Sequence, residues 1–504
     1  MVRIRHGEMP ATLESLGEAL TSIRKITSGL GIASAPLKTS GLTPYGFLFE
    51  SLQTKDCLLP DTDKTIPNLI NLGDSMTDTG NSSADSAIPS AYTYLGQFID
   101  HDTTLEINSD RLVRLEKNFK PLEPSEINYH IRNRRTPTLD LDCVYGPTSD
   151  GDPIPRICDS LTVGSVEPIG APVPNKDPFN DLPRKPASKN PGIDREAIIG
   201  DARNDENLIV SQMHVAFLRA HRAIVNKGYK FDAAKKILIE HYQWIIIHDF
   251  LKRRIADLET VTDLVNHGTR YYRPKDTCNL YMPLEFSGAA YRFGHSMVRA
   301  SYDVNANEQN ASLKDLFDVT AFSGQLAGQP HIPQSWVVDW QRFLDGGTNQ
   351  ARRIDTFMVD PLKRLQETTG VVVKNVMANL AIRNLLRGYL LRLPTGQKVA
   401  QYLGHKVLTP DEIKKKVGDD QFAILKAGEF HEHTPLWYYI LAESAIRGTG
   451  GLGPVGKTIV AETLIGLIRW TDNSILQQPG WKPTLGKYGG LFTLKDFFQL
   501  AGVW

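Results

Sequence analysis

The sequence predicts a mainly α fold, built as one large helical domain with long irregular loops and little β-structure. Apolar residues recur at the spacing of amphipathic helices in many segments, whereas the alternation typical of strands is scarce. Two long stretches, residues 36–90 and 147–199, are rich in glycine, proline and small polar residues and are expected to be irregular. Because so long an irregular stretch inside a globule usually serves a function, residues 147–199 are expected to wrap or gate a site.

The predicted helices follow one another along the chain. Leucines at helical spacing predict an N-terminal amphipathic helix over residues 13–30, for which packing on the body, a membrane role and a partner role all stay open. A helix is expected around residue 97, and the longest helical patterns cover residues 207–225, 231–255, 370–391, 435–447 and 458–473. We therefore expect an N-terminal helix and irregular extension over residues 1–85, followed by a single domain over residues 86–504.

Composition excludes several classes of protein. The 57 lysines and arginines are balanced by 57 aspartates and glutamates, so no basic field favours nucleic acid as a partner. The four cysteines are widely spaced without a CxxC pair, which disfavours a zinc ribbon but leaves free thiols or one or two bridges open. Neither GxGxxG nor GxxxxGK[ST] occurs, so a phosphate-cradling nucleotide site is not supported.

Targeting signals are also lacking. The first residues have no apolar core of a secretory signal, and the late apolar run over residues 458–475 is interrupted by Glu462, Arg469 and Asp472. We expect a soluble, cytoplasmic protein with no transmembrane segment, while export without a cleaved signal stays open. The sequence does not indicate the oligomeric state.

The motif GQFIDHD, at residues 96–102, places a histidine between two aspartates. Gln97 lies four residues before His101, and residues four apart share one face of a helix, so both side chains are expected to point into one cavity. An imidazole beside an amide suits acid–base chemistry, and the carboxylates of Asp100 and Asp102 suit a cation or a cofactor. A structural core histidine is the alternative for this motif taken alone.

The motif GDARNDE, at residues 200–206, opens a long predicted helix. Asp201 or Asn204 suits the capping position of that helix. Arg203 lies near the helix start, where a guanidinium is suited to stabilise a developing anion. A surface charge network is the alternative.

The motif AYRFGH, at residues 290–295, ends in a histidine preceded by a glycine. Gly294 permits a bulky group to approach the backbone, and the neutral imidazole of His295 is a natural metal ligand when its other nitrogen is hydrogen-bonded. A packed core histidine is again the alternative.

The motif TPTLDLD alternates oxygen-bearing side chains along a short extended run: Thr136, Thr138, Asp140 and Asp142. Calcium takes six to eight oxygen ligands, so this run is suited to hold it, although the spacing is not that of an EF-hand. A turn with solvated aspartates is the alternative.

The other histidines give weaker signals. No carboxylate completes an HExxH motif on the predicted helices, so the two pairs spaced seven apart are expected to be packing or capping residues: His214 with His221, and His241 with His248. His431 and His433 flank Glu432 in a predicted loop, where a surface metal site is a minor alternative.

Taken in their order along the chain, these four motifs resemble those of the animal-type haem peroxidases of the peroxidase–cyclooxygenase superfamily. The resemblance runs from about residue 86 to the C-terminus and also includes NLLRG at residues 384–388 and the full run TPTLDLDCVYG at 136–146. The pattern LGPVGKTIVAE at residues 452–462 is similar to bacterial members. The resemblance implies a large helical haem peroxidase domain with haem b as its cofactor.

It also implies roles for individual residues around the haem. His101 corresponds to the distal acid–base histidine, Gln97 to its neighbour in the distal cavity and Arg203 to the distal arginine. His295 corresponds to the proximal iron ligand, and Asn384 is expected to accept a hydrogen bond from the other ring nitrogen of His295.

The resemblance further implies a calcium site and covalent links to the haem. Calcium would be held by Asp102, Thr136, Thr138, Asp140 and Asp142. Asp100 and Glu206 match the carboxylates that form ester bonds to haem in mammalian members. The residue after the glutamate is Asn207 rather than methionine, so a sulfonium link is not expected. Arg292 is expected to pair with a haem propionate.

The implied activity is reduction of hydrogen peroxide through compound I and oxidation of small organic donors, with halides as an open alternative. A fatty-acid dioxygenase of the same superfamily is the second hypothesis. Its radical tyrosine lies three residues before the proximal histidine, where this chain has Arg292, and Tyr291 lies four before. A non-catalytic haem- or calcium-binding scaffold is the third hypothesis, but a mere binder needs neither His101 nor Arg203.

Overall fold

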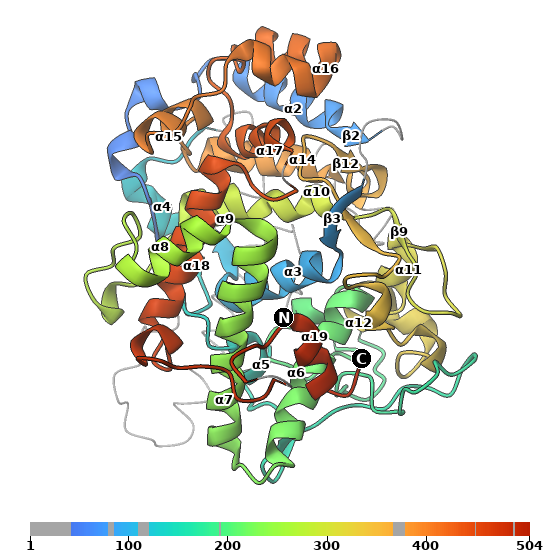
Figure 1. Cartoon of the computed structure of the whole chain (residues 1–504). Helices are drawn as coiled ribbons and strands as arrows, with labels where there is room; N and C mark the ends of the chain where they lie inside the picture. The colour runs from blue at the N-terminus through green and yellow to red at the C-terminus, as the bar shows by residue number, and fades with distance from the viewer. Residues whose placement is uncertain are drawn as a thin grey trace, which may run out of the picture.

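The computed structural model describes residues 42–78, 85–108, 120–190, 193–365, 378–448, 450–486 and 489–504. Across these residues the fold is mainly helical with short strands, which confirms the predicted fold class (Figure 1). The helices are α2 (Thr65–Ser75), α3 (Ala91–Thr103), α4 (Pro124–His130), α5 (Asp142–Tyr145), α6 (Leu208–Val225), α7 (Phe231–Ile245), α8 (Leu258–His267), α9 (Leu284–Gly288), α10 (Gly294–Met297), α11 (Leu313–Asp318), α12 (Ala321–Gly324), α14 (Leu380–Leu390), α15 (Gly396–Tyr402), α16 (Pro410–Ala427), α17 (Leu436–Arg447), α18 (Pro454–Trp470) and α19 (Leu494–Leu500). Three further helical segments position the site: η4 (Ala202–Asp205), the π-helical η5 (Ile246–Ile255) and η7 (Ala290–Phe293).

The strands form two-stranded ribbons. They are β1 (Tyr45–Gly46), β2 (Thr77–Asp78), β3 (Asp85–Pro89), β4 (Glu106–Asn108), β5 (Ile131–Asn133), β6 (Arg156–Ile157), β7 (Ser160–Leu161), β8 (Met282–Pro283), β9 (Ser301–Tyr302), β10 (Ala311–Ser312), β11 (Gln350–Arg352) and β12 (Met358–Val359). The ribbons β1–β8, β2–β12 and β3–β11 join distant parts of the chain. β1 pairs in parallel with β8, and β2 pairs in parallel with β12, whereas β4 and β5 are antiparallel.

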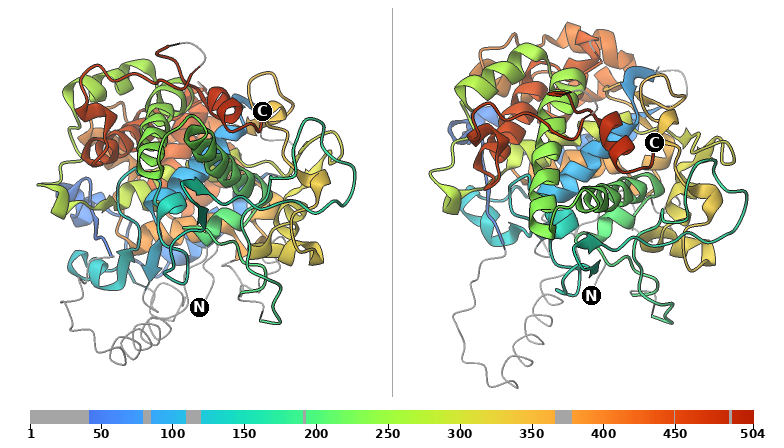
Figure 2. Two further views of the ribbon diagram at one scale, coloured as in Figure 1. Left: turned by 90° about the horizontal axis from the view of Figure 1, so that it is seen from below. Right: turned by 60° about the horizontal axis from the view of Figure 1, so that its bottom comes forward.

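Helix α3 lies in the interior and packs against α6 and α10 (Figures 1 and 2). Phe98 of α3 stacks on Phe217 of α6 with ring centroids 4.3 Å apart, and Tyr242 of α7 meets both rings edge-on. Full burial of a large apolar side chain contributes about 1.5–3 kcal/mol. These aromatic contacts therefore fix α3 firmly between its neighbours.

The long helical patterns of the sequence correspond to real helices. The predicted helix over residues 207–225 is α6, and Asn207 caps it by accepting a hydrogen bond from the Val210 amide at 3.1 Å. The pattern over residues 231–255 covers α7 and its π-helical continuation η5. The patterns over residues 435–447 and 458–473 correspond to α17 and α18, and α18 begins earlier than expected because Pro454 is tolerated in a first helical turn.

Helix α2 corrects the prediction of irregular chain over residues 36–90. Leu69 and Leu72 are fully buried on the side that packs against α14 and α16. A Cβ at Gly73 would lie 2.6 Å from Cγ1 of Ile382, so glycine lets α2 and α14 approach closely. Tertiary packing therefore stabilises a helix that its own glycine and asparagines disfavour.

Residues 147–199 are largely irregular, as predicted, and they are anchored to the site. Arg184 lies fully buried between Asp181 and Asp205, at 2.8 Å from each, and Asp205 belongs to η4. The predicted helix over residues 13–30 and the first part of the predicted helix over 370–391 lie outside the described residues. All four cysteines are free thiols. Within the described ranges, no helix has the length and apolar character needed to cross a bilayer.

Candidate active site

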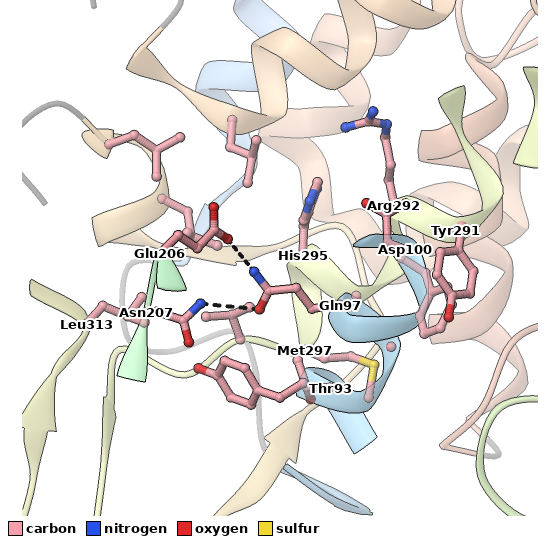
Figure 3. Close-up of a pocket in the computed structure, with 18 of the residues that line it drawn as sticks. Thr93, Gln97, Asp100, Glu206, Asn207, Tyr291, Arg292, His295, Met297 and Leu313 are labelled. Carbon is pink, nitrogen blue, oxygen red and sulfur yellow. Dashed lines mark hydrogen bonds between the residues drawn. The ribbon is translucent and has the colours of Figure 1, made fainter. Parts of the chain in front are cut away.

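A largely apolar cavity lies between α3, η4, η7, α10 and α14 (Figure 3). It encloses about 1200 Å³, including the part that opens to solvent. Its apolar lining includes Met297, Val298, Leu313, Phe317, Leu362, Leu365 and Leu380. Polar side chains also line it: Gln97, Asp100, Glu206, Arg292, His295 and Arg383.

Helix α3 contributes two of the predicted site residues to the cavity surface. Gln97 donates a hydrogen bond to Glu206 and accepts one from Asn207 at 3.3 Å (Figure 3). Asp100 accepts a hydrogen bond from the Thr104 hydroxyl at 2.9 Å. These bonds order the carboxylates before any ligand is present.

His101 differs from the expectation that it shares the cavity surface with Gln97. It is fully buried and is not among the residues that line the cavity. Its Nδ1 lies 2.8 Å from Oδ1 of Asn204, and Nδ2 of Asn204 lies 3.0 Å from Nδ1 of His214. The ring of His101 is therefore held by η4, and Asn204 links it to α6.

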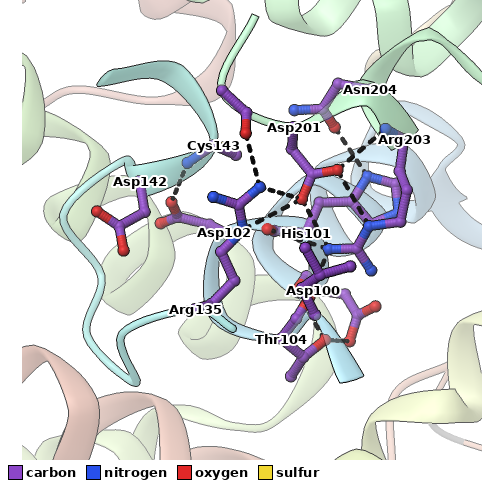
Figure 4. A network of polar contacts seen from close by, with 12 residues as sticks. Asp100, His101, Asp102, Thr104, Arg135, Asp142, Cys143, Asp201, Arg203 and Asn204 are labelled. Atoms are coloured by element: carbon purple, nitrogen blue, oxygen red, sulfur yellow. Dashed lines mark hydrogen bonds and ion pairs between the residues drawn. The ribbon is translucent and has the colours of Figure 1, made fainter. Parts of the chain in front are cut away.

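Arg203 is buried beside His101 rather than exposed in the cavity (Figure 4). Its Nη2 donates to the backbone carbonyls of His101 and Thr104 at the end of α3 and to Asp201 at 2.8 Å. Burial alone would lower the pKa of Arg203, but Asp201 outweighs burial and raises it. Arg203 is thus a permanent cation at the C-terminal end of α3.

Asp201 is the centre of this polar network. It accepts hydrogen bonds from Arg203 and from Arg135, whose Nη2 lies 2.5 Å away and also donates to the Gly200 carbonyl. Burial alone would raise the pKa of Asp201, but the two guanidinium groups outweigh burial and hold it far below its ordinary value. The sequence predicted Asp201 as a capping residue, and it does cap η4 through the Arg203 amide. The link to Arg135 carries no local sequence signal.

On the other side of the cavity, His295 is positioned by α14. Nδ2 of Asn384 lies 2.8 Å from Nδ1 of His295, so the two predicted partners meet. The oxygen of Asn384 instead accepts a hydrogen bond from Arg292 at 3.3 Å. The predicted direction, in which Asn384 accepts from His295, is therefore not the one seen, because Arg292 occupies the amide oxygen.

Arginines gather around the cavity. Burial lowers the pKa of Arg292 and of Arg387, and Asp100 opposes that effect in both. Arg387 of α14 forms an ion pair with Glu106 of β4. Arg292 and Arg383 line the cavity, and guanidinium groups beside apolar walls are suited to bind the carboxylates of a ligand.

The predicted calcium loop lies against the end of α3. The carboxylate of Asp102 accepts hydrogen bonds from the amides of Leu141 and Cys143, both at 3.2 Å. Burial and the neighbouring Asp142 raise the pKa of Asp140 to about 7. Burial, followed by the charges of Asp140 and Asp142, raises the pKa of Asp102.

These carboxylates therefore repel one another at close range. Thr136 lies at the exposed start of the loop, where its amide donates to Asp142. In the part of the chain that the structure describes, no group of three His, Cys, Asp or Glu side chains forms a ready metal cluster, at this loop or at His431 and His433.

The other histidines pack or hydrogen-bond as predicted. Tyr145 and the Asp159 carbonyl bind His221, and the amides of Thr484 and Leu485 donate to His241. His248 stacks on Trp244 with ring centroids 3.7 Å apart. His214 also hydrogen-bonds as predicted, but its partner Asn204 links it to the predicted site residue His101.

Comparison with known proteins identifies the family. The family model for animal haem peroxidases matches residues 113–469, which is more than half of the chain. The chain belongs to the animal haem peroxidase family. The match begins after the GQFIDHD motif, and it includes the motifs of Arg203, His295 and Asn384.

Individual relatives agree with this family. A "peroxidase-like protein" of Margaritifera margaritifera is 26% identical over 276 residues, which cover 45% of this chain and only about a third of that relative (34%). Among solved structures, peroxidase A from Dictyostelium discoideum matches with a TM-score of 0.59 and 16% identity over 86% of this chain and 89% of its own. A fatty acid alpha-dioxygenase of Oryza sativa matches with a TM-score of 0.53 and 14% identity over 88% of this chain and 77% of its own. At such identities the structural likeness concerns the fold alone.

Family membership implies haem, and the cavity fits it. A porphyrin needs apolar walls, a ligand for iron and cations for its carboxylates, and the cavity offers its apolar lining, His295 and the buried Arg292. Tyr291 and Ser323 line the cavity, and their hydroxyl oxygens are buried and make no hydrogen bond to any residue that the structure describes. Unpaired buried polar groups of this kind are costly unless a ligand or water meets them.

Proposed function

We propose that the chain is a haem peroxidase, which reduces hydrogen peroxide and oxidises small organic donors, with halides as further candidates. The observation that carries this proposal is the contact of Arg203 with the His101 carbonyl at the end of α3, the helix whose Gln97 and Asp100 line the same cavity as His295. Cleavage of an O–O bond needs both a proton carrier and a cation for the departing oxygen. A protein that only stores haem needs neither group.

Haem would be held in the cavity by His295 as its iron ligand and by Arg292 at a haem carboxylate, and it would supply the redox chemistry of the reaction. An iron-bound histidine needs an acceptor at its Nδ1, and the amide of Asn384 would meet that need with its oxygen turned toward His295. Nε2 of His101 would take a proton from peroxide and return it to the departing oxygen, and Arg203 would stabilise the negative charge on that oxygen. Both roles require that peroxide reach the cavity wall beside the end of α3.

Two further features belong to the same proposal. Calcium bound by Asp102, Thr136, Thr138, Asp140 and Asp142 would relieve the mutual repulsion of these buried carboxylates. Asp100 and Glu206 both reach the cavity surface, so each is a candidate for an ester bond to haem. Residues 86–504 would form the haem-binding domain.

A fatty-acid dioxygenase is the second candidate, favoured by the apolar lining and by the fold it shares with alpha-dioxygenases. The position three residues before His295 is Arg292, whose Nε donates to the Ser287 carbonyl at 2.8 Å. Tyr291 stacks on Phe286, with ring centroids 4.5 Å apart and its hydroxyl beside Gly96. Tyr291 therefore lies one residue away from the position of the radical tyrosine expected in a dioxygenase, and that position is taken by Arg292.

Activity of the haem-loaded protein separates the candidates. We expect phenol oxidation that depends on peroxide, and a loss of about 10²–10⁴-fold in His101→Ala, because that is the usual contribution of a general acid–base group. Tyr291→Phe should retain phenol oxidation, and oxygen uptake with a long-chain fatty acid should be slow. Rapid oxygen uptake with the fatty acid that disappears in Tyr291→Phe would establish the dioxygenase instead. If the protein binds haem but shows neither activity, the hypothesis of a non-catalytic haem-binding scaffold is the one that stands.

A further inference from the structure

Behind the cavity wall, three side chains form a continuous hydrogen-bonded line from α3 through η4 to α6. His101 Nδ1 lies 2.8 Å from Oδ1 of Asn204, and Nδ2 of Asn204 lies 3.0 Å from Nδ1 of His214. Asn204 and His214 are fully buried, as is His101. In a dry environment each such bond holds its partners firmly, because no water competes for them.

Each bond in this line fixes the next. The amide oxygen of Asn204 only accepts, so the nitrogen that faces it, Nδ1 of His101, must carry a hydrogen. The amide nitrogen of Asn204 only donates, so Nδ1 of His214 must accept. His214 is able to accept because burial lowers its pKa to about 3 and keeps the ring neutral.

The far end of the line is anchored by packing. His214 lies in the middle of α6, with the ring of Phe98 packed edge-on against it at a centroid distance of 6.0 Å. Its Nε2 is buried and makes no hydrogen bond to any described residue. Among the described residues, the polar contact of His214 is therefore the hydrogen bond that it accepts from Asn204.

We propose that Asn204, oriented by His214, is the positioning residue that sets the tautomer and ring orientation of His101. This inference rests on the proposed function, in which His101 carries the proton. With its hydrogen on Nδ1, Nε2 is the basic nitrogen of His101, which is the nitrogen that the proposed proton transfer uses. A wrong tautomer would place the hydrogen where the base must accept one.

The two asparagines of the site thus have opposite arrangements. Asn384 presents its nitrogen to His295, because Arg292 holds its oxygen. Asn204 presents its oxygen to His101, because His214 holds its nitrogen. The orientation of each amide is thus set by its second partner. For Asn204 that partner is the neutral ring of His214, which lies within helix α6.

Nuclear magnetic resonance reads the tautomer without any turnover. The haem-loaded protein, labelled with ¹⁵N-histidine and held in the diamagnetic ferrous carbon monoxide form, should show a hydrogen on Nδ1 of His101. The signal is assigned by its loss in His101→Gln. A hydrogen on Nε2 in wild-type protein would overturn the proposal, whatever the activity.

Kinetics test the positioning role. Asn204→Leu should slow the reaction with peroxide by about 10- to 100-fold, the usual cost of losing a group that orients a reactive side chain. The donor KM and the spectrum of the His295-ligated haem should not change. Asn204→Asp keeps an acceptor for Nδ1 and should restore most of the rate, and Ser211→Ala on α6 is the control. A rate for Asn204→Leu equal to the wild-type rate, or no recovery in Asn204→Asp, would overturn the proposal.

A double-mutant cycle isolates His214. His214→Phe should lower the peroxide rate, because the amide of Asn204 becomes free to turn over. The same substitution in the Asn204→Asp background should have almost no further effect, since both carboxylate oxygens accept. Additive losses would remove His214 from the role. If wild-type protein shows no peroxidase activity, the proposed function fails while the resonance experiment still decides the tautomer.

Discussion

Asp201 binds Arg203 through both its backbone and its side chain. The carboxylate accepts from the Arg203 amide at 2.9 Å, from Nε at 3.1 Å and from Nη2 at 2.8 Å. Its second partner, Arg135, directly precedes the predicted calcium loop. One carboxylate therefore couples that loop to the cation that the proposed reaction needs.

The first prediction concerns this carboxylate. Asp201→Asn should destabilise the protein by about 3–5 kcal/mol, because it leaves buried guanidinium charges without their counter-ion. Chemical denaturation measures the change. Asp177→Asn is the control, since Asp177 pairs with Arg219 at the surface with 49% of its side chain exposed, and such pairs contribute about 0–1 kcal/mol. Equal effects of the two substitutions would contradict the central role of Asp201.

The second prediction concerns the iron ligand. His295→Ala should lose haem or its normal ligation, because His295 is the imidazole that α14 holds at the cavity. Haem content and the absorption spectrum measure this. His267→Ala, at a side chain 73% exposed, is the control and should retain both. Full haem occupancy with an unchanged spectrum in His295→Ala would remove His295 from the role.

The third prediction concerns calcium. Dialysed protein should retain about one calcium per chain, as a site with several carboxylates binds tightly. Asp140→Asn and Asp142→Asn should reduce the calcium content and the Tm, whereas Asp152→Asn at an exposed position should change neither. Metal analysis and thermal unfolding measure these quantities. A transition metal at this loop, or no metal at all, would show that the loop has another role.

The fourth prediction concerns covalent haem. After turnover with peroxide, part of the haem should resist extraction by acid–acetone. Asp100→Asn and Glu206→Gln should each increase the extractable fraction, and the double variant should release all haem. Both carboxylates are held by a hydrogen bond beforehand, Glu206 from Gln97 and Asp100 from Thr104, so each single variant should keep part of the covalent fraction. Free extraction of all haem from wild-type protein after turnover would mean that both carboxylates only form hydrogen bonds.

The fifth prediction concerns pH. Burial raises the pKa of Glu285 to about 7 from its ordinary value of 4.5, although the amides of Leu48 and Phe49 donate to it. The folded state therefore binds more protons than the unfolded state between these values, and stability should fall as pH rises from about 4.5 to 7. The upper bound is about 3 kcal/mol, at about 1.4 kcal/mol per pKa unit. Denaturation at several pH values should show a flatter dependence in Glu285→Gln, and an identical slope would exclude Glu285 as the cause.

Local patterns predicted what depends on neighbouring residues in the chain. The apolar periodicity that defined α6, α17 and α18 is a property of each segment, and so is the cap of Asn207 on α6. The motif of His295 likewise resides in a few consecutive residues. Helix α2 was missed because its stability comes from α14 and α16, which lie hundreds of residues later in the chain.

Local sequence patterns could not predict contacts between segments that are distant in the chain. Nothing around Asn204 indicates that its amide lies between His101 and His214, because that depends on how α3 packs on α6. The burial of His101 behind Gln97 was missed for the same reason, since a shared helix face does not tell which neighbour covers it. The direction of the Asn384 amide depends on Arg292, for which the resemblance had implied a haem propionate as the partner.

The candidate site draws its side chains from α3, η4, α10 and α14, which begin at residues 91, 202, 294 and 380. On the ribosome, His101 emerges long before the asparagine that orients it, and His295 emerges before Asn384. A nascent chain therefore cannot assemble both halves of the cavity until α14 has emerged. Capture of a cofactor in this cavity has to wait for that helix, so it would report that segments made far apart in time have reached their native arrangement.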